Sequence, residues 1–355
     1  MSDAPQPLIT FVRYARNDGY APNYERRLNL SVAVLIQQAE KYKIPVEILV
    51  VEWNPPTDRP SLASVLIGAG ASHYATVRVV TVPPQYHQGF KGADAKGLHP
   101  ARALNVGYRR ARGIFATPFA SDSLLSEAVF QYVAAEGLDG KNIYRLDRFD
   151  LSPDFLDKAD QIVKSCNNKA LKELCESQTI NRHGAQDETL CDPLGLPRLH
   201  TNAAGDFLLM SRERWRALRG QPEDTDITCL DTDCITLHGA ATHGGDEVRL
   251  PNDCRVYKIS HGKVNHKNVT PVWNIWARGL SALFRLMTSC PAQRAYLRGL
   301  FDIPRRRLVH LPGTFPSFER NFYLKARHWH KKGKPVHLNS RNWGLGGVDL
   351  QEHQL

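Results

Sequence analysis

The sequence predicts an α/β protein in which a mostly parallel central sheet is flanked by helices. Two apolar runs of strand length, Leu8 to Tyr14 and Val46 to Glu52, enclose a segment from Pro22 to Lys41 whose apolar residues recur at helical spacing. Strand, helix and strand in this order build a parallel sheet with a right-handed crossover. A later apolar run, Ile114 to Phe119, stops at Asp122. Ligands of such sheets bind in the crevice at the carboxyl ends of the strands.

Length and composition fit a soluble globular enzyme. The 355 residues allow one large domain or one and a half, and 42% of them are hydrophobic while 23% are charged. Neither a secretion signal at Met1 to Pro7 nor a run of about 18 apolar residues is present, so we expect a cytoplasmic protein. The seven cysteines include no C-x-x-C pair, which argues against a disulfide framework and a zinc knuckle.

The net charge of +10 is concentrated in the C-terminal part of the chain. From Arg255 to the end there are 18 Lys and Arg against 4 Asp and Glu, whereas the remainder has 28 against 32. Such a basic region predicts a phosphate-rich partner, which can be a membrane surface, an anionic acceptor or nucleic acid.

The next elements continue the alternation of helices and strands. Ser61 to Gly68 has helix-forming sequence, and Val77 to Val82 is a third β-branched run. Pro83 to Gly97 has no periodicity and predicts a loop. Pro100 to Arg112 predicts a helix with four arginines, and Gly113 ends it.

Asp122 follows the strand at Ile114 to Phe119 and precedes a predicted helix from Leu124 to Glu136 and a strand from Asn142 to Leu146. Two interpretations of this carboxylate stay open. It holds a divalent metal on a nucleotide diphosphate, or it only caps the helix that follows, because Ser and Asp side chains accept hydrogen bonds from the first N–H groups of helices.

The second half of the chain begins with a polar region, Phe149 to Arg198, which is helical around Asp157 to Glu176 and is the predicted insertion or lid. The small-residue loop Thr201 to Asp206 then leads to a strand at Phe207 to Met210 and a helix at Arg212 to Leu218. This region returns the chain to the sheet.

A further helix ending at Ala241 follows Leu230 to Cys234, and the last predicted strand, Val256 to Ser260, ends at His261. The sequence then becomes aromatic and basic, with an amphipathic helix predicted over Trp273 to Met287. We interpret this part as an appendage.

In three places the sequence resembles the GT-A type glycosyltransferases, specifically the broad inverting group called family two. These places are the opening strand with Arg16-Asn17-Asp18, the segment Lys96 to Asp122, and the segment Thr201 to Asp233. In the second place the family pattern basic-x-x-Asn-x-Gly followed by Ala-x-Gly is matched by Arg102, Asn105, Gly107, Ala111 and Gly113. In the third place the matches are Gly205-Asp206-Phe207, an arginine at 212 or 214, Arg219 to Glu223, and Asp231-Thr232-Asp233.

Three further stretches resemble a less studied subgroup of these enzymes: Trp53 to Pro56, Leu199 to Ala203, and Asn342 to Leu345. The resemblance covers about residues 8 to 262, and the order of the motifs is its most specific feature.

The resemblance implies a site for a nucleotide-diphosphate sugar. The residues expected to bind it are Arg13, Arg16, Asn17, Asp18, Glu52, Asn54, Lys96, Arg102, Asn105, Ser121, Asp122, Gly205 and Asp206. Asp122 and His261 are the predicted ligands of Mn²⁺ or Mg²⁺. The family motif has two carboxylates around one residue, whereas Ala120-Ser121-Asp122 has one, which leaves metal dependence open.

Glycosyl transfer also requires a base for the acceptor hydroxyl and positive charge for the departing diphosphate. Asp233 is the predicted base and Asp231 the alternative, although one of them can instead cap the helix that follows. Lys96 and Arg102 are the predicted cations beside the metal.

The predicted catalytic domain spans residues 1–262, with a nucleotide-binding half at 8–122, the insertion or lid at 149–198 and an acceptor half at 199–262. The extension, 263–355, packs on this domain or on the inner face of an anionic membrane. The expected partners are a UDP- or GDP-linked sugar and a glycan, lipid-linked or small-molecule acceptor. Nucleic acid is not expected.

Two other functions stay open. A nucleotidyltransferase has a similar architecture, but a Gly-rich basic loop usually follows its first strand and is missing from Arg13 to Gly19. A non-catalytic nucleotide- or glycan-binding protein on a degenerate GT-A fold is suggested by the missing first acid and the basic C-terminal region.

Overall fold

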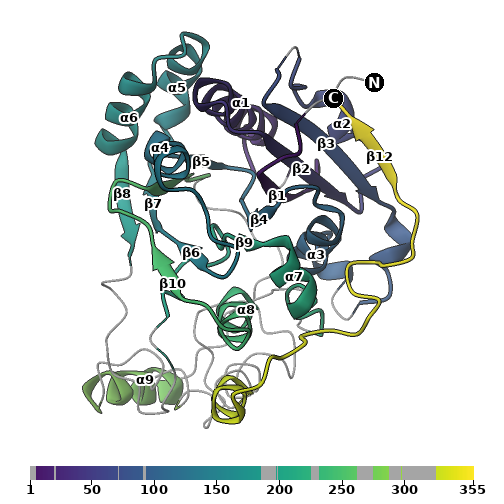
Figure 1. Ribbon diagram of the computed structural model, residues 1–355, viewed down its shortest axis with the longest axis vertical. Coiled ribbons are helices and arrows are strands. Elements are labelled where there is room, and N and C mark those ends of the chain that lie inside the picture. The colour runs from purple at the N-terminus through teal and green to yellow at the C-terminus, as the bar shows by residue number, and fades with distance from the viewer. Residues whose placement is uncertain are drawn as a thin grey trace.

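A computed structural model gives the arrangement of most of the chain. The residues it describes are 5–19, 21–70, 72–90, 93–184, 197, 199–224, 232–261, 275–287, 297 and 325–355. Two sheets and the helices around them account for most of these residues (Figure 1).

The central sheet has six strands, and its inner four run parallel. In spatial order the strands are β12 (Gln351–Gln354), β3 (Ala75–Val82), β2 (Val46–Trp53), β1 (Ile9–Ala15), β4 (Phe115–Pro118) and β9 (Met210–Ser211). The two edge strands, β12 and β9, pair antiparallel to their neighbours. The prediction of a mostly parallel sheet flanked by helices is confirmed.

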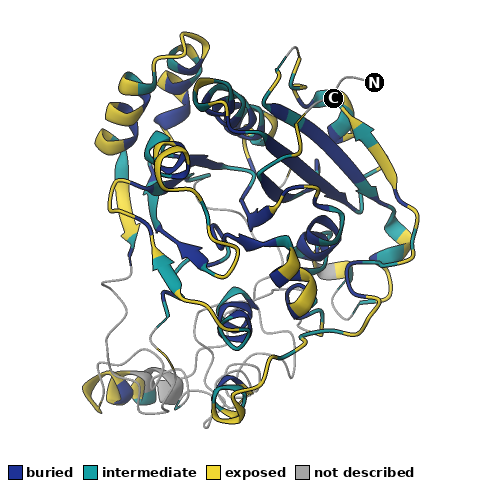
Figure 2. Cartoon of the chain, in the orientation of Figure 1, coloured by how far each residue is buried: buried dark blue, intermediate teal, exposed yellow. Residues whose placement is uncertain are grey.

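Helices cover both faces of this sheet, which explains why β2 is apolar along its whole length. Ile48 and Val50 pack in the same core cluster as residues of α1 (Tyr24–Tyr42). Leu49 and Val51 point the other way, into a cluster with residues of α3 (Pro100–Arg110). Strands that are buried on both faces need apolar side chains at successive positions, and every residue of β2 is buried (Figure 2).

The second sheet has four strands. Its order is β5 (Ser123–Leu125), β11 (Arg255–Ile259), β7 (Asp147–Leu151) and β8 (Thr179–His183). Leu151, Tyr257 and Ile259 on one face pack against α5 (Phe155–Lys164) and α6 (Asn168–Ser177). The opposite face carries polar side chains, among them Lys258 and Asp150.

The remaining elements are short. They are α2 (Leu62–Val65), the 3₁₀ turns η1 (Pro84–Tyr86) and η2 (Ala93–Ala95), α4 (Glu127–Glu136), the parallel pair β6 (Ile143–Arg145) and β10 (Glu247–Arg249), α7 (Arg212–Leu218), α8 (Thr232–Ala241) and α9 (Ile275–Met287). A further helix spans 325–332. Within the described residues, no helix is long and apolar enough to cross a membrane.

Strand order reverses between β1 and β4. From β1 the chain adds β2 and β3 on one side, and it then crosses back to place β4 on the other side. The carboxyl ends of β1 and β4 therefore form the switch point at which open α/β sheets bind their ligands. Arg16, Asn17 and Asp18 follow β1, and Asp122 follows β4.

Several predicted elements differ from the structure. Leu124 and Leu125 were expected in a helix but lie in β5, because they pair antiparallel with β11. The helix predicted around Asp157 to Glu176 is two helices, α5 and α6, separated at Asn167, which caps the second. The strand predicted at Phe207 to Met210 is shorter and ends at Ser211.

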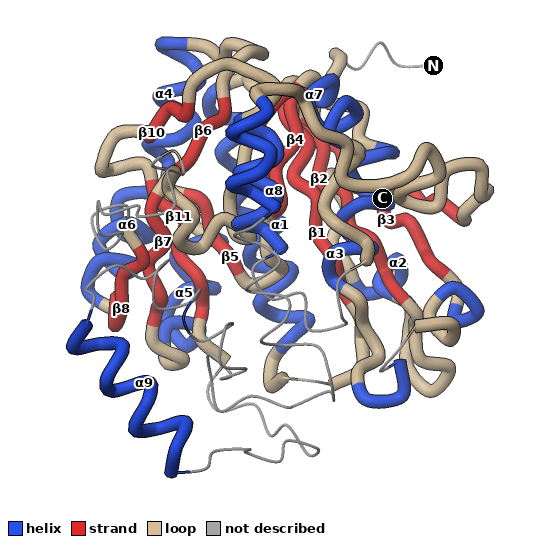
Figure 3. The backbone as a smooth tube through the Cα atoms, turned by 90° about the horizontal axis from the view of Figure 1, so that it is seen from below, coloured by secondary structure: helices blue, strands red, loops and turns tan. Residues whose placement is uncertain are grey.

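The C-terminal region does not lie wholly apart from the sheets. Arg110 donates hydrogen bonds to the backbone carbonyls of Gly344, Leu345 and Val348, at 2.9, 3.2 and 2.8 Å, and the chain then enters β12. By contrast, α9 is separate from both sheets (Figure 1 and Figure 3). Binding of this region to a membrane stays a prediction.

Candidate functional site

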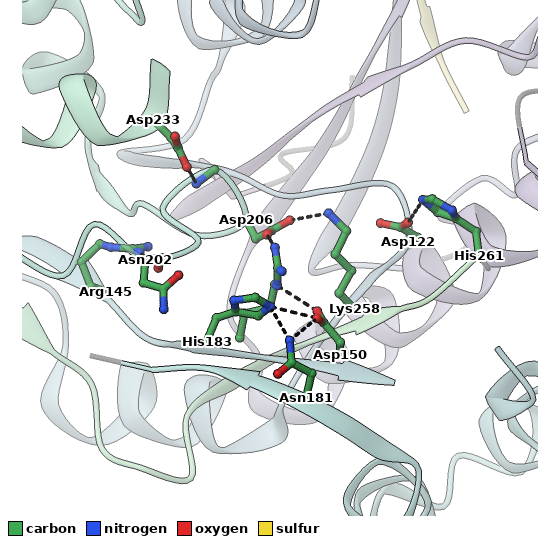
Figure 4. Close-up of polar contacts among 12 residues, drawn as sticks. Asp122, Arg145, Asp150, Asn181, His183, Asn202, Asp206, Asp233, Lys258 and His261 are labelled. Carbon is green, nitrogen blue, oxygen red and sulfur yellow. Dashed lines mark hydrogen bonds and ion pairs between the residues drawn. The ribbon is translucent and has the colours of Figure 1, made fainter. Parts of the chain in front are cut away.

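Asp122 lies at the junction of the two sheets. Its backbone carbonyl accepts a hydrogen bond from the N–H of Ile259 at 2.9 Å, and the next residue, Ser123, pairs with Lys258 in the antiparallel β5 and β11. This pairing brings the end of β11 to Asp122, and His261 Nε2 lies 4.0 Å from Asp122 Oδ2 (Figure 4). Sequence positions 122 and 261 thus meet, as the metal prediction requires.

Buried hydrogen bonds fix the backbone on either side of Asp122. The hydroxyl of Ser121 donates to the carbonyl of Tyr14 at 2.9 Å and accepts from the hydroxyl of Tyr24 at 3.4 Å. These contacts tie the turn after β4 to the end of β1 and the start of α1. Burial, together with the charge of Asp122, raises the pKa of Tyr24, so its hydroxyl stays protonated as a donor.

Arg13 lies beneath the same turn and is wholly buried. Its Nη2 donates to Ser31 Oγ at 2.9 Å, and Ser31 in turn donates to the carbonyl of Ser123. Burial lowers the pKa of Arg13 to about 9, against the opposing charge of Asp122. Arg13 therefore supports the segment that carries Asp122 from within the core.

Asp206 links two cations of the second sheet, Lys258 and Arg148. Lys258 Nζ lies 3.0 Å from Asp206 Oδ1, and Arg148 Nη1 lies 2.5 Å from Oδ2 (Figure 4). Burial acts to raise the pKa of Asp206, but the charges of Lys258 and Arg148 outweigh it and lower the pKa to about 2. Asp206 is thus a fixed counter-ion, ionised at neutral pH.

This pKa predicts an acid-labile contribution to stability. The folded-state pKa of Asp206 is depressed from 3.8 to about 2, so its contribution is complete above about pH 5 and is lost as the pH falls toward 2. Asp206→Asn should lower the free energy of unfolding at pH 7 by about 2 kcal/mol, measured by urea denaturation. The difference from the wild type should shrink at low pH. The exposed Asp157→Asn is the control. If the free energies of unfolding of Asp206→Asn and the wild type differed by the same amount from pH 7 to pH 3, the depressed pKa of Asp206 would be refuted.

Asp233 is held near Asp206 by the loop before β9. Its Oδ2 accepts the N–H of Gly205 at 2.6 Å, and its Oδ1 accepts the N–H of Cys234 at 3.0 Å. A side chain at position 205 would place its Cβ 3.1 Å from Asp233 Oδ2, which explains the glycine. Each carboxylate oxygen has two lone pairs, so these bonds leave Asp233 able to accept a further proton.

The loop after β1 folds onto the loop after β2. Arg16 Nε donates to the carbonyl of Asn54 at 2.6 Å, and Arg16 Nη1 pairs with Asp18 at 2.7 Å. Asn54 Nδ2 donates to the carbonyl of Gly97 at 2.9 Å. Three predicted nucleotide-binding residues are therefore adjacent at the carboxyl ends of β1 and β2, close along the chain to Lys96, which is exposed.

Asn17 and Glu52, which were also predicted to bind nucleotide, form hydrogen bonds within the protein. Asn17 is buried and donates to Glu25 at 2.9 Å and to the carbonyl of Pro60 at 3.1 Å. Glu52 is buried and accepts the N–H of Leu62 at 2.8 Å, and burial raises its pKa. Their roles in nucleotide binding stay predictions.

Arg102 and Asn105 on α3 hold the loop after α7. Arg102 Nη2 donates to the carbonyl of Glu223 at 2.8 Å, and Asn105 Nδ2 donates to Glu223 Oε1 at 2.9 Å. Asn105 also exchanges two hydrogen bonds with the backbone of Gln221, at 2.7 and 2.8 Å. These contacts give Arg102 and Asn105 a structural role that requires no ligand. Binding of the nucleotide sugar by either residue stays a prediction.

Asn105→Ala should therefore act on stability. Removal of its three bonds leaves the N–H of Gln221 buried without this acceptor, and we expect a loss of about 2 kcal/mol in the free energy of unfolding, measured in urea. The exposed amide Gln131→Ala is the control. A variant of wild-type stability with weakened nucleotide binding would instead assign Asn105 to the ligand.

The cations Lys258 and Arg148 were not predicted from the sequence. Both lie within strands, on the face of the second sheet that also carries Asp150, Asn181 and His183 (Figure 4). Asp150 forms an ion pair with Arg148 at 3.0 Å, and its other carboxylate oxygen lies 2.9 Å from His183 Nε2. The only sequence signal was a lysine between Tyr257 and Ile259 in an otherwise apolar strand.

Asp122 and His261, the predicted metal ligands, lie side by side in the structure. Asp122 and His261 supply one oxygen and one nitrogen, and Mg²⁺ or Mn²⁺ can take its remaining ligands from water and phosphate. Within the described residues, however, no group of three His, Cys, Asp or Glu side chains is placed to hold a metal. The donor set does not form a ready-made metal site, and metal binding stays a prediction.

The structure thus brings together five predicted residues: Asp122, Gly205, Asp206, Asp233 and His261 (Figure 4). Lys258 links Asp206 to the neighbourhood of Asp122, because its ammonium group pairs with Asp206 and its backbone pairs with Ser123, the residue after Asp122. The alternative base, Asp231, lies outside the described residues.

No protein-family model matches the chain, and no curated protein matches it in sequence. Among solved structures it is similar to S. aureus TarS 1–349 in complex with UDP-GlcNAc, with a TM-score of 0.46, 9% identity, and coverage of 92% of this chain and 73% of that one. TarS 1–349 without a named ligand gives a TM-score of 0.46 and 10% identity, with 92% of each chain covered. The likeness is remote.

Proposed function

We propose that this chain is a glycosyltransferase that moves a sugar from a nucleotide-diphosphate sugar to an acceptor hydroxyl. One observation carries the proposal: Asp122 lies at the switch point of a parallel sheet, and the pairing of β5 with β11 brings Lys258 and His261 to it from a distant part of the sequence. Lys258 pairs in turn with Asp206, and the residue before Asp206, Gly205, holds the predicted base. The order of family-two motifs along the chain supports the same reaction class.

The departing diphosphate needs positive charge on the enzyme side of the breaking bond. The loop with Arg16 after β1 and the ammonium group of Lys258 flank the carboxyl ends of β1 and β4. A diphosphate placed there meets cations from both sheets. If Mn²⁺ or Mg²⁺ binds, Asp122 and His261 would hold it, and it would add charge stabilisation to the leaving group.

The acceptor hydroxyl must lose a proton as it attacks the sugar carbon. Asp233 is the base in this proposal, because its carboxylate is held in place by two backbone N–H groups, one of which belongs to Gly205, the residue before the Asp206 counter-ion. Attack on the face opposite the diphosphate would invert the anomeric carbon. The acceptor is a glycan, a lipid-linked glycan or a small hydroxylated molecule.

A thermal-shift panel of UDP, GDP, ATP and GTP tests this function. We expect UDP or GDP to stabilise the protein, because a ligand present at about 100 times its Kd adds about 2.7 kcal/mol to the free energy of unfolding. A preference for triphosphates would favour a nucleotidyltransferase instead. Absence of any shift would favour a protein without a nucleotide site.

A further inference from the structure

The lysine beside Asp122 gives the site a built-in positive charge. We propose that Lys258 contacts the diphosphate of the donor and that nucleotide diphosphate binding therefore does not require a divalent metal. This inference rests on the proposed function and concerns the source of the charge at the leaving group.

The backbone places Lys258 at the switch point. Lys258 pairs with Ser123, and the following residue, Ile259, donates its N–H to the carbonyl of Asp122 at 2.9 Å. Asp122 is therefore joined to β11 by a backbone hydrogen bond. Because β5 follows β4 directly, any ligand at the carboxyl end of β4 also lies against this part of β11.

The ammonium group is fixed rather than mobile. Lys258 Nζ donates to Asp206 Oδ1 at 3.0 Å, and the other oxygen of Asp206 is held by Arg148 at 2.5 Å. Burial acts to lower the pKa of Lys258, but the charges of Asp206 and Asp122 outweigh burial and raise it. Lys258 is thus charged at neutral pH. If a ligand draws the ammonium group away from Asp206, Arg148 remains paired with Asp206.

The side chain of Lys258 is not fully covered by the protein. The side chain of Lys258 is 28% exposed, compared with 8% for Asp206. An ammonium group has three N–H donors, of which the bond to Asp206 uses one. Phosphate oxygens approaching from the exposed side would therefore meet a donor with a full positive charge, and such charge-assisted bonds are about twice as strong as neutral ones.

The same charge disfavours a metal at Asp122. Asp122 acts electrostatically on Lys258 and on the buried Arg13, so two cations already offset its negative charge. A divalent ion at Asp122 and His261 would be repelled by both. The missing first acid of the metal motif, at Ala120, fits this arrangement, because a site with a resident cation needs fewer carboxylates.

Calorimetric titration of the full-length protein with UDP and with GDP tests the inference directly. We expect one of them to bind in excess EDTA with an affinity within about threefold of that measured in Mn²⁺, a difference of less than about 1 kcal/mol. Binding that appears only with Mn²⁺ would overturn the inference and leave the proposed function intact. Absence of binding in both conditions would overturn both.

Variants at position 258 test whether this lysine supplies the positive charge that binds the diphosphate. Lys258→Met should weaken binding of the same nucleotide in EDTA by about 10- to 100-fold, because it removes a charge-assisted hydrogen bond. Lys258→Arg keeps the charge and should restore most of the affinity. Lys158→Met, on the exposed side of α5, is the matched control. Equal affinity of Lys258→Met and the control would overturn the assignment, and far-ultraviolet circular dichroism confirms that each variant is folded.

Discussion

Asp233→Asn is expected to lower kcat by about 10²- to 10⁴-fold while it leaves the affinity for the nucleotide sugar unchanged. The amide cannot accept the proton of the acceptor hydroxyl. Its carbonyl oxygen can still accept the N–H of Gly205, which lies 2.6 Å from the carboxylate in the structure, so the loop before β9 should keep its place. Steady-state transfer and calorimetric titration of the donor together separate the loss of chemistry from the loss of binding.

The exposed Asp157→Asn serves as the control for this variant, because it removes one carboxylate without touching the site. Turnover of Asp233→Asn equal to that of the control would exclude Asp233 as the base and would direct attention to Asp231. A parallel loss of donor affinity would show that Asp233 binds the donor rather than the acceptor proton.

Gly113→Ala is expected to lower the free energy of unfolding by about 3 kcal/mol, at the upper end of overpacking effects. A Cβ on this residue would lie 2.7 Å from the carbonyl oxygen of Phe115 and 2.7 Å from both the backbone nitrogen and the hydroxyl of Thr10. These are atoms of β1 and β4, whose pairing joins Thr10 to Ala116. Relief of the clash must therefore move strands that form the switch point.

Urea denaturation of Gly113→Ala beside Gly89→Ala measures this effect. Gly89 has nothing within 4 Å of an added Cβ, so Gly89→Ala reports how a methyl group changes the free energy of unfolding when it meets no clash. We also expect nucleotide affinity to fall for Gly113→Ala only, since Asp122 follows β4. Equal stability of the two variants would show that β1 and β4 can separate without strain.

The sequence predicted the centre of the fold well and its edges poorly. β1, β2 and β3 are runs of β-branched and apolar residues buried on both faces, a signal carried by the residues themselves. β12 is Gln-Glu-His-Gln, which has no strand signal, and it is a strand only because it pairs with β3. β5 contains two leucines that suit a helix equally well, and β11 decides between the two structures.

The same distinction applies to the site. Asp122 was predicted because it follows a strand, and Gly205 and Asp233 were predicted because they match the order of glycosyltransferase motifs. Lys258 and Arg148 were not, because a cation within a strand has meaning only once its neighbours across the sheet are known. Asn17, Glu52 and Asn105 were predicted to bind nucleotide, but each is buried and hydrogen-bonded within the protein, to Pro60, Leu62 and Gln221 respectively. These partners are known only once the chain has folded.

The most direct measurement for the central claim is a crystal structure of the full-length protein with the nucleotide diphosphate that stabilises it. We expect the diphosphate at the carboxyl ends of β1 and β4, within hydrogen-bonding distance of Lys258 and beside Asp122, with Asp233 facing the position of the sugar. A nucleotide bound elsewhere, with Lys258 and Asp206 still paired and solvent over Asp122, would contradict it.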